Sequence, residues 1–183
     1  MLEEIIFSLS DEEIIGELIR RHNSTKHYVS KEIEERFLNA YKVLPKAGRE
    51  IVKAYKEIVL SDGGRDPKGV LLVLIGGRAK GKPLVEDSDI DLTFAIGDLN
   101  GHIGRILRSR EDLRPEDFGN TSIICSYYGN IINIKNLKSE MCKIAKKYNI
   151  KVPIHCLGIG DYATIKKEML NIRPYSIPIA YTK

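Results

Sequence analysis

Hydrophobic residues recur every three or four positions through the first third of the chain, which is the spacing of amphipathic helices. A Ser-x-x-Glu pattern at residues 10–13 is typical of a capping box and predicts a helix that runs to about Arg21. A second helix is predicted after Ser30 and a third over residues 46–60, with Pro45 ending or kinking the second. We therefore expect an N-terminal helical segment.

The pattern changes after a stretch rich in glycine, aspartate and proline at residues 61–69. Two continuous apolar runs follow, at residues 70–75 and 92–96, and they predict buried strands. We place a boundary in the polar stretch, giving a helical segment over residues 1–64 and a second unit over residues 65–183.

In the rest of the chain, segments with the hydrophobic spacing of helices alternate with segments that have the pattern of strands. We expect a short arginine-bearing helix around residues 103–110, a hairpin of strands around Gly129, a helix over 137–148 and a strand over 151–159. A final short helix is predicted to begin at Asp161 or Thr164, and the tail with its two prolines is expected to be extended. Strands and helices in this order predict an α/β (α+β) fold.

Composition and charge limit the class of protein. The 183 residues carry a formal net charge of +4, and no apolar run approaches the length of a membrane span. The acidic N-terminus lacks the basic start of a secretory signal, and the three cysteines show no Cys-x-x-Cys spacing. We therefore expect a cytoplasmic protein with no membrane partner, no disulfide framework and no cysteine zinc site.

The first two predicted helices also suggest a helix-turn-helix. However, their connection is longer than the usual three or four residues. The second helix carries Glu32, Glu34 and Glu35, which would repel DNA phosphates. We therefore expect these helices to form a cap that packs on the core.

The stretch between the two apolar runs has the most informative chemistry. A glycine-rich basic turn is followed by Asp89-Ile90-Asp91, and strand alternation places both aspartates on one face, with Ile90 on the other. Paired carboxylates suit Mg²⁺, which completes its coordination with phosphate oxygens and water. Glycines permit close approach of a phosphate, and Arg78, Lys80 and Lys82 supply positive charge. The pattern predicts a site for a metal-bound nucleoside triphosphate.

Gly76-Gly77, the eleven intervening residues and Asp89-Ile90-Asp91 resemble the signature of the DNA polymerase beta-like nucleotidyltransferase superfamily, and above all its minimal nucleotidyltransferases. The resemblance implies a mixed β-sheet flanked by helices over residues 65–183. It also implies that Mg²⁺ or Mn²⁺ binds Asp89 and Asp91. The residues it assigns to the nucleotide are Gly76, Gly77, Arg78, Lys80, Lys82 and Ser88.

Two other interpretations of the motif remain. Gly76 to Lys82 also matches the first seven positions of a Walker A loop, but Pro83 stands where that loop has Ser or Thr. Too few residues follow for the helix of a P-loop fold. The other alternative is a plain glycine turn with solvated aspartates.

A third acidic residue on a later strand is usual in the superfamily, and this chain departs from that pattern. His155 occupies the expected position on the strand at residues 151–159. A neutral imidazole can accept a proton, although Mg²⁺ prefers oxygen ligands. His155 is therefore a catalytic candidate, with the ordinary strand histidine as its alternative, and Asp117 and Asp161 are the other acidic candidates.

The predicted function is transfer of a nucleoside monophosphate from an NTP to a protein, an RNA or a small molecule. A catalytically impaired module of the same fold, which binds a nucleotide or nucleic acid, is the alternative. Residues after 62 carry an excess of six positive charges, 19 Lys/Arg against 13 Asp/Glu, and this suits either a triphosphate or a nucleic acid. A structural protein that binds partners through its glutamate-rich helices is a third possibility.

Overall fold

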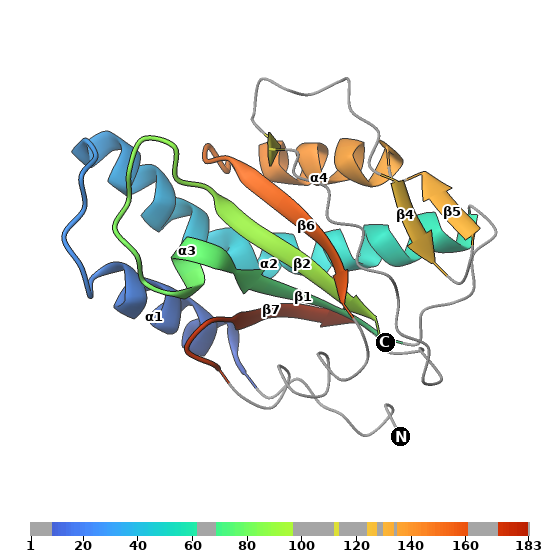
Figure 1. Ribbon diagram of the computed structural model, residues 1–183, viewed down its shortest axis with the longest axis horizontal. Helices are drawn as coiled ribbons and strands as arrows, with labels where there is room; N and C mark the ends of the chain where they lie inside the picture. The colour runs from blue at the N-terminus through green and yellow to red at the C-terminus, as the bar shows by residue number, and fades with distance from the viewer. Residues whose placement is uncertain are drawn as a thin grey trace.

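The computed structural model describes residues 9–61, 69–96, 112–113, 124–127, 130–133, 135–160 and 172–182. Four helices and seven strands are assigned in these ranges (Figure 1). The helices are α1 (Asp11–His22), α2 (Lys31–Ser61), α3 (Gly76–Ala79) and α4 (Lys135–Lys147). The strands are β1 (Val70–Ile75), β2 (Ile90–Ile96), β3 (Asp112–Leu113), β4 (Ile124–Tyr127), β5 (Asn130–Asn133), β6 (Ile154–Gly160) and β7 (Ile177–Thr182).

Five strands form one mixed sheet in the order β3-β6-β2-β1-β7. β2 and β6 are parallel, and the other neighbouring pairs are antiparallel. The expected mixed sheet with flanking helices and an N-terminal helix is therefore confirmed. β4 and β5 form a separate antiparallel pair, which confirms the predicted hairpin.

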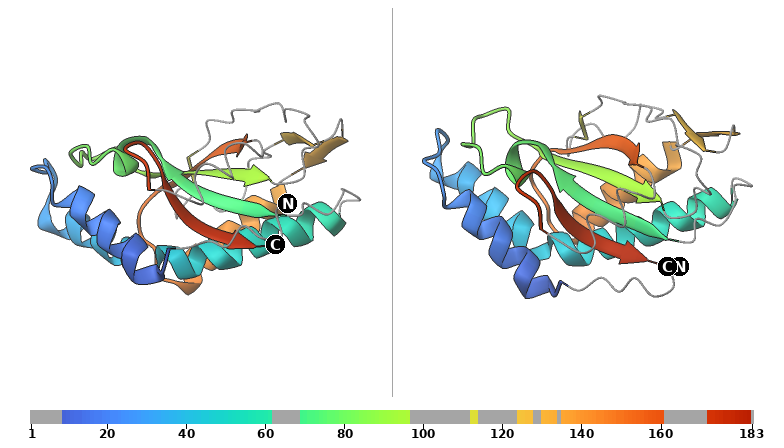
Figure 2. Two further views of the ribbon diagram at one scale, coloured as in Figure 1. Left: turned by 90° about the horizontal axis from the view of Figure 1, so that it is seen from below. Right: turned by 60° about the horizontal axis from the view of Figure 1, so that its bottom comes forward.

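Helices α1, α2 and α4 lie on one side of the sheet (Figure 2). Alternation along the strands directs Leu72, Leu92 and Phe94 into one core with these helices, and Tyr55 of α2 stacks on Phe94 with ring centroids 4.7 Å apart. The core contains residues from both predicted units, and α1 and α2 pack on it as a cap. A smaller apolar cluster, Leu71, Val73 and Ala95, occupies the opposite face of the sheet.

The start of α1 confirms the capping box. The Ser10 hydroxyl accepts a hydrogen bond from Glu13 N at 3.1 Å, and Glu13 Oε2 accepts one from Ser10 N at 2.7 Å. Both partners lie within one helical turn, so the local sequence is sufficient to determine this helix start.

The predicted end of the second helix at Pro45 and the separate third helix are wrong, because α2 is one helix of 31 residues that runs through the proline. The apolar stripe keeps helical spacing on both sides of Pro45, and a break would take one half out of register with the core. An interior proline costs roughly 3 kcal/mol, whereas each large apolar side chain contributes about 1.5–3 kcal/mol on burial. The large buried side chains of α2 are Phe37, Tyr41, Leu44, Ile51, Val52, Tyr55, Ile58 and Val59.

The C-terminal segment is extended, as predicted, and its residues 177–182 pair with β1 as an edge strand of the sheet. Pro178 lies in this strand next to a register shift, which is the environment in which a strand tolerates proline. The predicted strand at 151–159 corresponds to β6, and the predicted helix at 137–148 corresponds to α4. The short helix predicted around residues 103–110 and the final helix after Asp161 lie outside the described residues.

Candidate functional site

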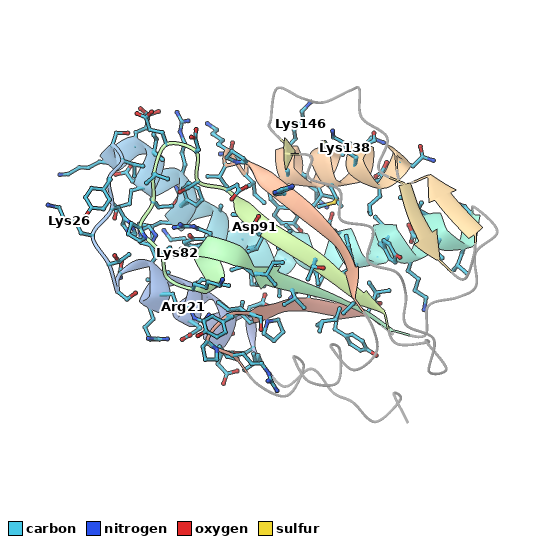
Figure 3. All side chains as sticks on the ribbon, in the orientation of Figure 1. Arg21, Lys26, Lys82, Asp91, Lys138 and Lys146 are labelled. Carbon is cyan, nitrogen blue, oxygen red and sulfur yellow. The ribbon has the colours of Figure 1, made fainter. Side chains whose placement is uncertain are left out.

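Asp89, Asp91 and His155 come together at the end of the sheet where β1 meets α3. His155 is the register partner of Asp91 on the neighbouring parallel strand, and its Nδ1 lies 3.5 Å from Asp91 Oδ1 and 3.7 Å from Asp89 Oδ2. Figure 3 shows Asp91 at this end of β2, beside α3. One ligand atom from each residue lies within 4.8 Å of the others, so the three groups are spaced to hold a metal ion.

Strand alternation explains why these side chains are available. Ile90 and Leu92 are fully buried in the core beneath the sheet, whereas the side chains of Asp89 and Asp91 are 29% and 16% exposed on the other face. The His155 side chain is 12% exposed. The site is therefore sheltered and still open to solvent.

Gly76 follows β1 and supports this face in a way that no other residue can. Its φ of +71° lies in the left-handed region, and a Cβ there would stand 1.8 Å from Asp91 Oδ2. A Cβ at Gly77 would meet only the Lys82 Cβ, at 4.0 Å. The first glycine thus makes room for the carboxylate, and the second leaves open space over the backbone.

The three cations of the turn differ in position. Arg78 is 7% exposed, donates to the Pro83 carbonyl at 3.0 Å and lies over the Phe37 ring, 5.8 Å from its centroid. Lys80 and Lys82 are exposed, and the Lys80 ammonium is 5.6 Å from the centroid of the Tyr175 ring. Arg78 therefore braces the turn from inside, while the two lysines are the cations accessible to an anion.

Ser88 closes the approach to the aspartates. Its hydroxyl accepts a hydrogen bond from Val85 N at 2.9 Å, and its own N–H donates to Val85 O at 2.9 Å. Ser88 is 8% exposed, so it fixes the turn that delivers Asp89 to the site. A direct contact of Ser88 with the nucleotide stays a prediction.

Arg21 ties the glycine turn to the rest of the fold. Its guanidinium donates to the carbonyls of Ala79 and Arg173, and Glu17 Oε1 lies 2.6 Å from its Nε. Hydrogen bonds from Arg20 and Arg21 lower the pKa of Glu17 from 4.5 to about 2. A pocket of about 410 Å³ adjoins this network, and its charged lining residues are Glu17, Arg20, Arg21, Lys80 and Arg173.

The Walker A alternative does not fit the fold. A P-loop joins a strand to a long helix, whereas only the four-residue α3 follows β1. β1 and β2 are also antiparallel neighbours, with no crossover helix between them. Among the candidate folds for this motif, the P-loop is therefore excluded.

The structure partly answers which residue accompanies Asp89 and Asp91 at the site. His155 faces the aspartate pair, while Asp117 and Asp161 lie outside the described residues. Sequence reasoning missed Asp112, which β3 places in register with His155 on the side away from β2. Asp91, His155 and Asp112 thus occupy one row across three neighbouring strands. A two-residue strand gives almost no sequence pattern, so nothing in the sequence marked this position.

Within the described residues, every helix is too short or too polar to cross a bilayer. Comparisons with known proteins add no assignment, because no family model, curated protein or solved structure matches the chain. Any account of its function therefore depends on the motif and on the geometry of the site.

Proposed function

We propose that the protein transfers a nucleoside monophosphate from an NTP to an acceptor hydroxyl, with release of pyrophosphate. The observation that carries the proposal is the convergence of Asp89, Asp91 and His155 beside a glycine whose missing side chain makes room for Asp91. Two carboxylates and exposed lysines form the set of groups that a metal-bound triphosphate requires.

The donor set fits Mg²⁺ or Mn²⁺. Asp89 and Asp91 provide oxygen ligands, and the space that a Cβ of residue 76 would fill admits the Asp91 carboxylate. When bound, the ion would supply charge neutralisation for the triphosphate and the leaving pyrophosphate. The open backbone at Gly77 would approach the phosphates, and Lys80 and Lys82 would neutralise further negative charge.

His155 is proposed as the general base. It would accept the proton of the acceptor hydroxyl, whose oxygen forms a bond to the α-phosphorus while the bond from the α-phosphorus to the pyrophosphate oxygen breaks. Its Nδ1 stands 3.5 Å from Asp91, so the carboxylate would stabilise the imidazolium that forms.

The test uses NTPs labelled at either the α- or the γ-phosphate, with Mg²⁺ or Mn²⁺ and a cell extract as the source of acceptor. With the wild-type protein, label from the α-position should enter an acceptor and label from the γ-position should leave as pyrophosphate. With the Asp89→Asn/Asp91→Asn double variant, neither should occur. Absence of α-label in any product, or equal labelling by the double variant, would refute the proposal. Transfer of the γ-label would indicate a kinase instead.

The presence of His155 where a carboxylate is usual supports a second candidate, a non-catalytic nucleotide-binding module of the same site. Its signature would be metal-dependent binding of ATP by calorimetry, with no pyrophosphate released during prolonged incubation.

A further inference from the structure

A second cluster of potential ligands lies beyond the aspartate site, where α1 joins α2. His22 ends α1, His27 lies in the connection and Glu34 is in the first turn of α2. His22 Nε2 is 3.3 Å from Glu34 Oε1, and the imidazole rings of His22 and His27 have centroids 4.0 Å apart. One ligand atom from each of the three residues lies within 4.8 Å of the others.

His22 is buried and His27 is half-buried, and each ring has one buried nitrogen without a hydrogen-bond partner. The His22 side chain is 0% exposed, yet its Nδ1 has no hydrogen-bond partner, and the same is true of His27 Nε2. A buried polar atom normally has a partner, because leaving it unsatisfied costs free energy. The unpartnered Nε2 of His27, on a ring adjacent to His22 and close to the Glu34 carboxylate, points to a ligand that the protein alone does not provide.

From this geometry we propose that His22, His27 and Glu34 bind a divalent transition metal ion, of which zinc is the best match. Two imidazoles and one carboxylate form a known three-residue zinc ligand set, with the fourth position open to water. Ligands about 2.0–2.1 Å from a tetrahedral ion stand roughly 3.3–3.4 Å apart, which the pair of His22 Nε2 and Glu34 Oε1 already satisfies at 3.3 Å.

The charges around the cluster act in two directions. The Arg78 guanidinium disfavours a cation at the cluster, and its hydrogen bond to Pro83 O and its contact with the Phe37 ring fix its position. The Glu34 carboxylate is the compensating negative group.

Metal binding by His27 has a consequence for the aspartate site. His27 Nδ1 accepts a hydrogen bond from Leu84 N at 3.1 Å, so the proton of the neutral ring is on Nε2. Ligation through Nε2 moves that proton to Nδ1 and removes the acceptor of Leu84. The bond from Tyr28 N to Leu84 O at 3.0 Å remains, so the segment stays attached by one of its two anchors while the other is lost. The metal would thus act on the strand approach that leads to Asp89.

The inference is independent of nucleotide transfer, so the test removes the other candidate metal site. The full chain with Asp89→Asn/Asp91→Asn is titrated with zinc alone by calorimetry. We expect one equivalent to bind. Adding Glu34→Gln should weaken binding by at least the ~10–100-fold that loss of an outer-shell partner costs, and adding Glu35→Gln should leave it unchanged. Glu35 is the exposed neighbour on the same helix, and circular dichroism of both variants would confirm equal folding.

Two results of the binding measurements would overturn the inference. One is the absence of zinc binding in the Asp89→Asn/Asp91→Asn protein, and the other is equal affinity in the Glu34→Gln and Glu35→Gln variants. Nitrogen NMR of the His27 ring gives a separate readout. Zinc should move its proton from Nε2 to Nδ1, and an unchanged tautomer in the zinc-loaded protein would rule out the proposed ligation.

Discussion

Replacement of Gly76 by alanine tests the geometry of the aspartate site. A non-glycine residue at a φ of +71° costs about 1–2 kcal/mol, so the free energy of unfolding should fall by that amount. The new Cβ would also stand 1.8 Å from Asp91 Oδ2 and 2.7 Å from Asp91 Cγ, and real Cβ atoms essentially never come closer than 3.0 Å to a non-bonded heavy atom. The carboxylate would therefore have to move by roughly 1 Å, a misplacement that costs on the order of 10²-fold in rate.

Gly81→Ala is the matched control. Gly81 has a φ of +67°, so alanine there carries the same backbone cost, but its Cβ would approach Ser24 Oγ at 3.0 Å and no aspartate. Urea denaturation measures the stability of both variants, and titration with Mn²⁺ followed by electron paramagnetic resonance measures the site.

The two variants should lose similar stability, and only Gly76→Ala should lose Mn²⁺ affinity and pyrophosphate release. Wild-type Mn²⁺ affinity and activity in Gly76→Ala, or an equal loss of Mn²⁺ affinity in Gly81→Ala, would refute the reasoning.

Three further predictions concern packing, pH and catalysis. Gly48→Ala in α2 should lower the free energy of unfolding by about 1–3 kcal/mol, because its Cβ would lie 2.8 Å from Ile179 Cγ2. Gly16→Ala, with no atom within 4 Å of its Cβ, should raise the free energy of unfolding by roughly 0.5–1 kcal/mol. Urea denaturation that changed the free energy of unfolding in the same direction in both variants would contradict the packing described for α1 and α2. Since the pKa of Glu17 falls from 4.5 to about 2 on folding, its stabilisation is present above pH 4.5 and is lost as the pH falls toward 2. Glu17→Gln should therefore lower the free energy of unfolding by about 1 kcal/mol at pH 7, after allowance for solvent screening. It should also reduce the dependence of the melting temperature on pH between pH 4.5 and 2. The same pH dependence in the variant as in the wild type would argue against the ion pair of Glu17 with Arg20 and Arg21. His155→Ala should reduce the rate of transfer by about 10²–10⁴-fold with little change in Mn²⁺·NTP affinity, while an equal loss of affinity and rate would make His155 a metal ligand rather than a base.

The sequence was sufficient to predict those parts of the structure that depend on contacts between residues close together in the chain. The capping box at Ser10 and Glu13 spans one turn, and the apolar run at residues 70–75 has the bounds of β1. The alternation of Asp89, Ile90 and Asp91 follows from strand geometry alone, and it places the carboxylates on one face.

Tertiary contacts decided the features that sequence reasoning missed. α2 continues through Pro45 because both of its halves pack on one core, and Arg78 turns inward because Pro83 and Phe37 receive its guanidinium. Neither effect has a local sequence pattern. Two further features also depend on how distant segments meet in the fold. One is the register of His155 with Asp112, and the other is the cluster of His22, His27 and Glu34.

Calorimetric titration of the protein with NTP, in the presence and absence of Mg²⁺, tests the proposed metal–triphosphate site most directly. The wild-type protein should bind NTP only with Mg²⁺ present, and Asp89→Asn/Asp91→Asn should abolish the binding while the protein remains folded. Binding that is independent of Mg²⁺, or that persists in the double variant, would contradict the assignment of Asp89 and Asp91 as the metal–triphosphate site.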